Sequence, residues 1–343
     1  MIYGKLSLKD WRTARVEGET PESSFESYNF RLFFFGTLYN RDQLQSSPAD
    51  SNAKLVADAY LADSNYGFSR LDGSFTIVYY SKEECGIVRD HHGTHYSIYC
   101  TPEGDFASSW TYLEKQSGKP FSYDPGALGI FLRRGLLPQG FGSMADASLL
   151  GGGEQFHMFT ENGFITSELP EEVRSLSWNM LKEKSPEFKE MLEEGSFSLK
   201  RDHIFRRDPQ IVTDITPDVE SYSRRYGELH RQAIRRRIGD SHRVGVLLSG
   251  GYDSGANLAA LRSIYDGPVD SYSVGFKGDA WTELPMARLM SETFGTCHHE
   301  YEIDGTEIAS LPDIVRFLGE PFVEGGLMVN YCAMRMIGDD KPD

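Results

Sequence analysis

The sequence predicts a two-domain protein of mixed α/β and α+β class, with a β-rich first half and a second half built on parallel strands. Its 343 residues exceed the usual length of a single domain. Short runs of aromatic and β-branched residues alternate with polar connections in the first half. Residues 244–248 form an apolar run that leads into paired glycines and a helix-forming segment, an order typical of a buried parallel strand, a turn and a helix.

Composition is that of a globular protein and excludes several function classes. Hydrophobic residues make up 39% of the chain and charged residues 25%. No apolar run approaches the ~20 residues that cross a bilayer, and residues 1–8 lack the apolar core of a signal peptide. We therefore expect a cytoplasmic protein without a membrane partner.

The charge of the chain argues against nucleic acid as a partner. The net charge is −16, and unspecific nucleic-acid binding needs a basic surface that displaces counterions. A basic cluster at 231–237 is the exception. It lies at helical spacing beside Ala233, Ile234 and Ile238 and is typical of a solvated helix face.

The cysteines give no sign of a metal or redox site. Four are present, dispersed and without the CxxC spacing of a zinc site or a redox pair. The sequence predicts isolated buried thiols at Cys85, Cys100, Cys297 and Cys332.

The elements of the first half follow from apolar patterning. A helix is expected over 53–61, where apolar residues recur at steps of three and four and Asp50 or Ser51 can cap the start. A second helix is expected over 127–132, with Pro125 near its N-terminus. Buried strands are predicted at 31–36, 75–80, 85–90, 96–100 and 106–110. His91, His92 and His95 lie in a polar turn and are expected to be exposed rather than metal-bound.

The passage between the domains is predicted in a charged, proline-containing stretch at 168–215. We place the domains at 1–200 and 201–343. A helix is expected to begin at Thr216 and Pro217 and to end at Gly239. Its predicted apolar stripe comprises Val219, Tyr222, Tyr226, Leu229, Ala233 and Ile238.

The turn after the strand at 244–248 is the strongest functional signal in the chain. Gly250 and Gly251 let the backbone turn sharply, and the following helix N-terminus presents unpaired N–H groups that favour a phosphate. A carboxylate beside a polyphosphate is repulsive unless a divalent cation lies between them. Asp253 therefore predicts Mg²⁺ as well as a nucleotide.

The string from Ser249 to Ser254, Ser-Gly-Gly-Tyr-Asp-Ser, resembles the PP-loop of ATP pyrophosphatases, which cleave ATP between the α and β phosphates. No Lys follows the glycines, so the loop is not a Walker A motif. The resemblance implies that the ATP and pyrophosphate ligands are Ser249, Gly250, Gly251, Asp253 and Ser254, with Asp253 also holding Mg²⁺.

A second parallel strand is predicted at 269–275, beside the first. Ligands of open α/β sheets bind at the carboxyl ends of the strands. The resemblance implies adenine contacts from Leu247, Val274 and Gly275, although these apolar residues fit a purely structural role equally well.

Segments of the first half occur in the order found in the glutaminase domain of class II asparagine synthetases. They are Phe35–Asn40, Leu71–Phe75, Arg89–Gly93, Phe106–Ser109 and 127–138. Together with the PP-loop, they give a resemblance to asparagine synthetases over nearly the whole chain. It implies an αββα sandwich of the N-terminal nucleophile hydrolase type, followed by part of a PP-loop α/β synthetase domain with a parallel sheet.

The chemistry of that glutaminase domain is missing. The family uses a Cys directly after Met1, whose thiol is the nucleophile, and this chain has Ile2. The family's Asn-Gly-Glu segment is replaced here by Phe35-Gly36-Thr37, and its Arg-Gly-Pro-Asp stretch is absent. We therefore expect a glutaminase fold without glutaminase activity.

Two segments after the second strand, Thr282–Ala287 and Cys297–Glu300, resemble a helix and a strand of the family. The family's Asp-Glu pair is reduced here to Glu283, because Thr282 replaces the Asp. In the family, the strand that carries the equivalents of His298 and His299 is remote from the nucleotide, so a structural role is expected for both.

The resemblance implies an ATP-dependent ligase that forms an amide through an acyl-adenylate, releasing AMP and pyrophosphate. The implied substrate is a specialised metabolite or a peptide, that is, a small-molecule or peptide carboxylate and amine. The family's synthetase domain continues past the equivalent of Asp343, so its catalytic residues are expected beyond residue 343 or on a second polypeptide. A non-catalytic ATP-binding or scaffolding protein is the alternative, and a homodimer is left open.

Overall fold

The structure is a computed structural model that describes residues 1–9, 11–44, 47, 50–101, 103–137, 142–145, 147–161, 164–167, 202–203, 218–278, 282–323, 325–340 and 342. The chain divides into two compact units, which are described separately. The first comprises residues 1–209 with 317–323, and the second comprises residues 210–316 with 324–343. The domain boundary predicted between residues 200 and 201 lies outside the described residues.

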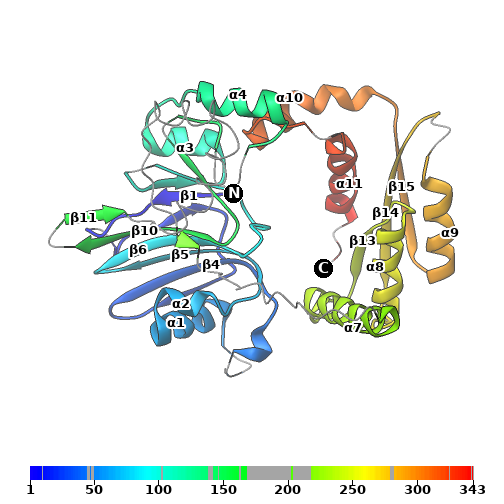
Figure 1. The fold of residues 1–343 in the computed structure, drawn as a ribbon, viewed down its shortest axis with the longest axis horizontal. Coiled ribbons are helices and arrows are strands. Elements are labelled where there is room, and N and C mark those ends of the chain that lie inside the picture. Colours follow the sequence, from blue (N-terminus) through cyan, green and yellow to red (C-terminus); the bar gives the residue numbers. More distant parts are fainter. Residues whose placement is uncertain are drawn as a thin grey trace. The chain divides into compact units, whose positions relative to one another are not determined.

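The first unit contains two antiparallel sheets (Figure 1). Among the described residues, one has the order β2-β1-β8-β7-β9 and consists of Val16–Gly18, Ile2–Lys5, Asp105–Ala107, Ile98–Cys100 and Ser148–Leu150. The other has the order β11-β10-β6-β5-β4-β3 and consists of Phe164–Ser167, Glu154–Glu161, Glu84–Arg89, Gly73–Ser81, Phe30–Leu38 and Ser23–Glu26. The short strand β12 (Asp202–His203) also pairs with β10.

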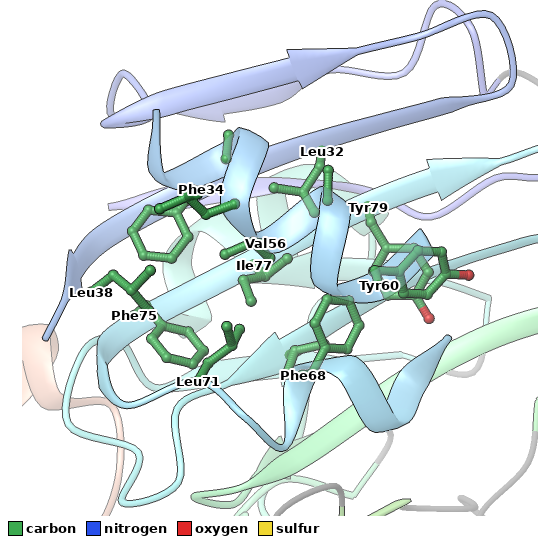
Figure 2. Packing of buried hydrophobic residues seen from close by; sticks show 14 of the residues in the cluster. Leu32, Phe34, Leu38, Val56, Tyr60, Phe68, Leu71, Phe75, Ile77 and Tyr79 are labelled. Atoms are coloured by element: carbon green, nitrogen blue, oxygen red, sulfur yellow. The ribbon is translucent and has the colours of Figure 1, made fainter. Parts of the chain in front are cut away.

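Three apolar clusters define four layers in this unit. The cluster between the sheets includes Ile2 and Phe106 from one sheet and Val78 from the other. A second cluster joins the β3–β6 sheet to α1 (Asn52–Asp63) and α2 (Asn65–Phe68), and Figure 2 shows Tyr60 of α1 and Phe68 of α2 close to Tyr79 of β5. A third cluster packs α3 (Trp110–Ser117) against the sheet that contains β1, β8 and β7. The layers therefore run helices, sheet, sheet, helix.

Local sequence explains where the helices of the first unit begin. The Ser51 hydroxyl accepts a hydrogen bond from the Lys54 amide at 3.2 Å, so Ser51 rather than Asp50 caps α1. The Asp124 carboxylate caps α4 (Pro125–Arg134) in the same way. The short helix η1 spans Arg41–Gln43.

Two predicted strands are shorter than expected, and the strand predicted over 96–100 begins only at Ile98. The strand predicted over 106–110 ends at Ala107, because Trp110 starts α3 and packs its ring 4.2 Å from that of Tyr99. The aromatic side chain that suggested a strand is buried by a helix instead.

The second unit is built on a parallel sheet of order β13-β14-β15, formed by Val244–Leu247, Val269–Phe276 and Cys297–Ile303. The predicted pairing of the first two strands is confirmed. The remaining elements are α7 (Val219–Ile238), α8 (Tyr252–Arg262), α9 (Leu284–Phe294), η2 (Thr306–Ser310), α10 (Leu311–Leu318) and α11 (Leu327–Asp340).

The two faces of the parallel sheet are covered by different helices. On one face Val244 and Val269 pack with Leu258 of α8 and Ala287 of α9, and α7 lies against α8 (Figure 1). The other face carries Gly245, and α11 contacts β14 and β15. Each strand therefore presents alternate residues to two distinct environments.

Helix α7 differs from its prediction in two respects. The Asp218 carboxylate accepts a hydrogen bond from the Ser221 amide, so Asp218 caps a helix that begins at Val219, and the predicted start at Thr216 lies outside the described residues. Only the C-terminal end of the predicted stripe packs in the core, through Ile238. The exposed members of the stripe are Val219, Tyr222, Tyr226 and Leu229.

No helix in the described part of the chain is long and apolar enough to cross a membrane. Three cysteines are buried as predicted, but Cys297 is exposed, because it is the first residue of β15. The expectation of a buried thiol was wrong at this position.

Candidate nucleotide site

The site begins where β13 ends. The Leu248 amide donates a hydrogen bond of 2.9 Å to the carbonyl of Tyr272 on β14, and Leu248 is buried. The Ser273 hydroxyl donates to the carbonyl of Leu248. These bonds extend the sheet one residue past β13 and fix the direction in which the chain leaves it.

Gly250 makes the turn that follows, and no other residue type fits without displacement. Its φ is +89°, in the region that disfavours side chains. A Cβ at Gly250 would lie 2.8 Å from the carbonyl oxygen of Glu283 and 3.0 Å from the amide nitrogen of Ala287. The loop therefore lies directly against the start of α9, and local sequence does not predict this contact.

The hydroxyls of Ser249 and Ser254 close the loop. The two oxygens are 3.0 Å apart, and each accepts a backbone hydrogen bond of 3.2 Å, from Gly251 and Ser249 respectively. The structure thus brings both predicted serines together across the glycine turn. The N–H groups of Ser249 and Gly251, which the resemblance assigns to phosphate, are held within the loop here.

Helix α8 presents an N-terminus that is open to an anion. Gly251 is its N-cap residue, and no side chain among the described residues caps it. The first-turn N–H groups and the positive end of the helix dipole therefore face outward beside the turn. Tyr252 is 96% exposed, so its side chain points into solvent and does not cover this end of the helix.

Asp253 fits the metal-binding role expected of it. It is exposed in the first turn of α8, and its carboxylate makes no hydrogen bond or ion pair with a described residue. An exposed carboxylate beside an anion-binding helix end is the type of oxygen ligand that Mg²⁺ takes together with substrate phosphates. The donor chemistry therefore suits Mg²⁺.

The three predicted adenine contacts lie on adjacent strand ends. Leu247 ends β13 and is 47% exposed, whereas Val274 is half-buried near the end of β14. Gly275 is buried, and a Cβ there would lie 2.7 Å from the Cδ1 of Leu284. The strand ends and the glycine turn share the carboxyl edge of the sheet, where α/β proteins bind ligands.

His298 lies in a partly buried network on the face covered by α9. Its Nδ1 is 2.7 Å from the hydroxyl of Ser271, and its Nε2 is 2.9 Å from the carboxylate of Glu300, which pairs with Arg288 of α9. Ser271 is fully buried, so this serine–histidine–glutamate arrangement offers no accessible nucleophile. Its contacts join α9 to the sheet, in keeping with the predicted structural role.

Ile2 occupies the position of the glutaminase nucleophile and is part of the hydrophobic core. The Ile2 side chain has no exposed surface and packs between the two sheets, while its amide donates to the Ser108 hydroxyl at 3.0 Å. The ammonium group of Met1 pairs with the Glu19 carboxylate at 3.1 Å.

The histidine turn of the first unit is less exposed than predicted. The Asp90 carboxylate accepts hydrogen bonds from the backbone amides of His92, Thr94 and His95. His95 is half-buried, its Nδ1 lies 3.1 Å from the Thr76 hydroxyl, and burial lowers its pKa. The expectation of exposure was therefore wrong for His95, because Asp90 draws the turn inward; His91 is also partly buried, and only His92 is exposed.

Comparison with known proteins finds a similarity in the second unit. Residues 225–341 match the family model "Asparagine synthase". Over 92 residues the chain is 30% identical to a Methanocaldococcus jannaschii protein named "Putative asparagine synthetase (glutamine-hydrolyzing) 2". This match covers 26% of the chain and 18% of that protein.

Two solved structures resemble the chain only slightly. A glutamine phosphoribosylpyrophosphate amidotransferase from B. subtilis, complexed with ADP and GMP, superposes with a TM-score of 0.32 at 13% identity, covering 89% of this chain and 77% of that one. A glutamine-dependent NAD⁺ synthetase from Acinetobacter baumannii, in complex with ADP, gives 0.29 at 12% identity, covering 87% and 64%. TM-scores this low do not define a shared fold.

The glycine loop, the parallel sheet and the helices α8, α9 and α11 all lie inside the segment that matches the family model. Residues 225–341 are therefore the part of the chain that is similar to the asparagine synthase family.

Proposed function

We propose that the protein is an ATP-dependent ligase that forms amide bonds through an acyl-adenylate. The proposal rests above all on one arrangement, the uncapped N-terminus of α8 beside the positive-φ turn at Gly250 and the Ser249–Ser254 pair, within the segment that matches the asparagine synthase family model. In this reaction a carboxylate oxygen attacks the α-phosphorus of ATP, and pyrophosphate leaves. An amine then attacks the acyl carbon, loses a proton and displaces AMP.

The residues of the loop have distinct roles in this proposal. The helix N–H groups and the hydroxyls of Ser249 and Ser254 hold the leaving pyrophosphate, because fixed donors stabilise the charge that develops there. When phosphate enters, the loop's internal hydrogen bonds, such as that from the Gly251 amide to Ser249, exchange for bonds to phosphate oxygens.

Asp253 is the residue proposed to hold Mg²⁺, which would neutralise phosphate charge when bound. Leu247, with nearly half of its side chain exposed at the end of β13, offers an apolar surface to the adenine. Val274 and Gly275 contribute backbone and packing on the neighbouring strand.

The first unit is proposed to be a glutaminase-like domain that has lost its activity. Its four layers correspond to the αββα sandwich of N-terminal nucleophile hydrolases. Ile2 supplies no thiol, and its burial leaves no space for glutamine beside it. The amine is therefore proposed to come from the substrate, a small molecule or a peptide, rather than from glutamine.

Isotope exchange between pyrophosphate and ATP tests the proposal. The purified protein, ATP, Mg²⁺ and labelled pyrophosphate are incubated with a panel of carboxylates, and we expect exchange that depends on one of them. ATP binding without exchange across the panel would favour a non-catalytic ATP-binding protein. Ammonia release from glutamine above background would contradict the assignment of the first unit.

A further inference from the structure

A second cluster of ligand-type side chains lies on the face of the parallel sheet opposite to α8 and α9. Asp270 is the second residue of β14, and Cys297 and His299 are the first and third residues of β15. Asp270 pairs with Cys297 in the sheet, and alternate residues of a strand share a face. One ligand atom from each of the three lies within 4.8 Å of the other two.

Two of the three side chains are held in place before any ligand arrives. Asp270 is 2% exposed, and its carboxylate accepts hydrogen bonds of 2.6 and 2.9 Å from the guanidinium of Arg243. The Nε2 of His299 lies 2.9 Å from the Oδ1 of Asp270, and the imidazole stacks on the ring of Tyr272 with centroids 4.8 Å apart. The exposed Cys297 opens the cluster to solvent.

The combination of donors selects the kind of metal. Thiolate and imidazole favour zinc and similar transition metals, whereas Mg²⁺ and Ca²⁺ take oxygen ligands. Zinc sites with three protein ligands keep a water molecule in the fourth position. We propose that Asp270, Cys297 and His299 form a Zn²⁺ site with one open coordination position.

Arg243 is compatible with a metal at this site but lowers the affinity for the metal. The carboxylate of Asp270 has two oxygens, and Oδ2 can keep its bond to the Nε of Arg243 while Oδ1 turns to the metal. An outer hydrogen bond of this kind orients a ligating carboxylate. The guanidinium charge opposes the metal charge, so we expect reversible binding rather than a permanently filled structural site.

The site is separate from the proposed nucleotide site. Asp270 and Cys297 lie at the amino ends of parallel strands, whereas the glycine loop follows the carboxyl end of β13. Zinc binding would tie the first residues of β14 and β15 together and cover the exposed thiol. Success or failure of this proposal is therefore independent of the ATP reaction.

Thiol reactivity and metal titration test the proposal on the whole chain. Cys297 is exposed and the other three cysteines are buried, so a thiol-reactive disulfide reagent should modify one thiol rapidly in the native protein. One equivalent of Zn²⁺ should protect that thiol, and Co²⁺ should give a thiolate charge-transfer absorption band. Binding should release protons, because the thiol must ionise.

Variants identify the ligands. Cys297→Ser and His299→Gln should each weaken Zn²⁺ binding by roughly tenfold or more. His298→Gln is the matched control, because its side chain lies on the opposite face of β15, and it should bind within about twofold of the unchanged protein. Far-ultraviolet circular dichroism without metal checks that each variant is folded.

The proposal is overturned if Zn²⁺ leaves the reactive thiol unprotected in the unchanged protein. It also fails if the folded Cys297→Ser and His299→Gln variants bind as tightly as the His298→Gln control, since binding would then come from other surface groups.

Discussion

The carboxylate of Glu320 accepts a hydrogen bond of 2.9 Å from the backbone amide of Ser143, although 177 positions separate the two residues in the chain. Both belong to the first unit, because that unit includes residues 317–323, from the last turn of α10 onward. Gly319 lies against Trp110 so closely that a Cβ would come within 2.3 Å of its ring. The polar side chain of Glu320 is thereby held in a partly buried position.

Replacement of Glu320 by Gln should change how stability depends on pH. Burial raises the pKa of Glu320, and the hydrogen bond from Ser143 opposes part of that rise. The folded state therefore binds the proton more tightly than the unfolded state does. The stability that this provides is fully present below the ordinary carboxyl pKa and is lost as pH rises through the higher pKa of the folded protein.

Denaturant unfolding at several pH values measures this effect. Glu320→Gln keeps a neutral side chain, so its unfolding midpoint should fall less between acid and neutral pH than that of the unchanged protein. Asp313→Asn is the control, because Asp313 is an exposed residue of α10 paired with Arg316. Identical pH profiles for the Glu320→Gln variant and the unchanged protein would contradict the prediction.

Gly250→Ala should damage the nucleotide loop far more than Gly251→Ala does. A side chain at Gly250 is strained at φ +89° and meets the backbone of Glu283 and Ala287. The cost is about 1–3 kcal/mol of stability, together with loss of ATP binding. Gly251 has φ −80°, and its added Cβ would meet only the Ser249 hydroxyl, at 3.3 Å.

Calorimetric titration with ATP, alongside thermal unfolding, distinguishes the two glycine variants. Equal losses of ATP affinity in both would mean that the turn geometry at Gly250 is not what the loop depends on.

Asp253→Asn should remove the effect of Mg²⁺ on ATP binding. The amide keeps the size of the side chain but loses the charge that attracts the cation, so the Mg²⁺-dependent gain in affinity should fall by roughly tenfold or more. Binding of ATP alone should weaken less, because the repulsive carboxylate is also removed.

Asp266→Asn, on the exposed residue just past the other end of α8, is the matched control and should titrate like the unchanged protein. ATP titrations with and without Mg²⁺ make the comparison. If Asp253→Asn retains the full Mg²⁺ effect, the cation is held elsewhere.

Ile2→Ala should destabilise the first unit by about 2–5 kcal/mol, because it leaves a cavity between the two sheets. Ile2 has no exposed surface, whereas Leu132 on α4 is 82% exposed. Leu132→Ala should therefore change stability by no more than about 0.5 kcal/mol.

Chemical unfolding of the Ile2→Ala and Leu132→Ala variants measures the difference between their free energies of unfolding. Similar stability of both would show that the position of a family nucleophile is not a packed part of the core in this protein.

Local sequence correctly predicted β5 and the glycine turn that leads into α8. The run of aromatic and β-branched residues at 75–80 predicted β5, and the glycine pair before a helix-forming segment predicted the turn into α8. These predictions hold because strand propensity and the φ requirement of Gly250 are set by residues close together in the chain.

Other features could not be read from neighbouring residues. The exposed stripe of α7 carries the same apolar spacing as a buried helix, and Tyr222 looks like a core residue until the packing is known. Cys297 has no sequence partner at metal-site spacing, and Asp270 reaches it only through the register of β14 and β15.

The sequence by itself determined the strand–glycine–helix loop, the charge of Asp253 and the absence of a thiol at Ile2. These depend on residue chemistry and on backbone conformation over a few positions. Only the tertiary structure decided that Glu283 supports Gly250, that Glu320 meets Ser143, and that Asp270, Cys297 and His299 share one face of a sheet. Such contacts join distant segments, and their geometry comes from strand register and packing rather than from local propensity.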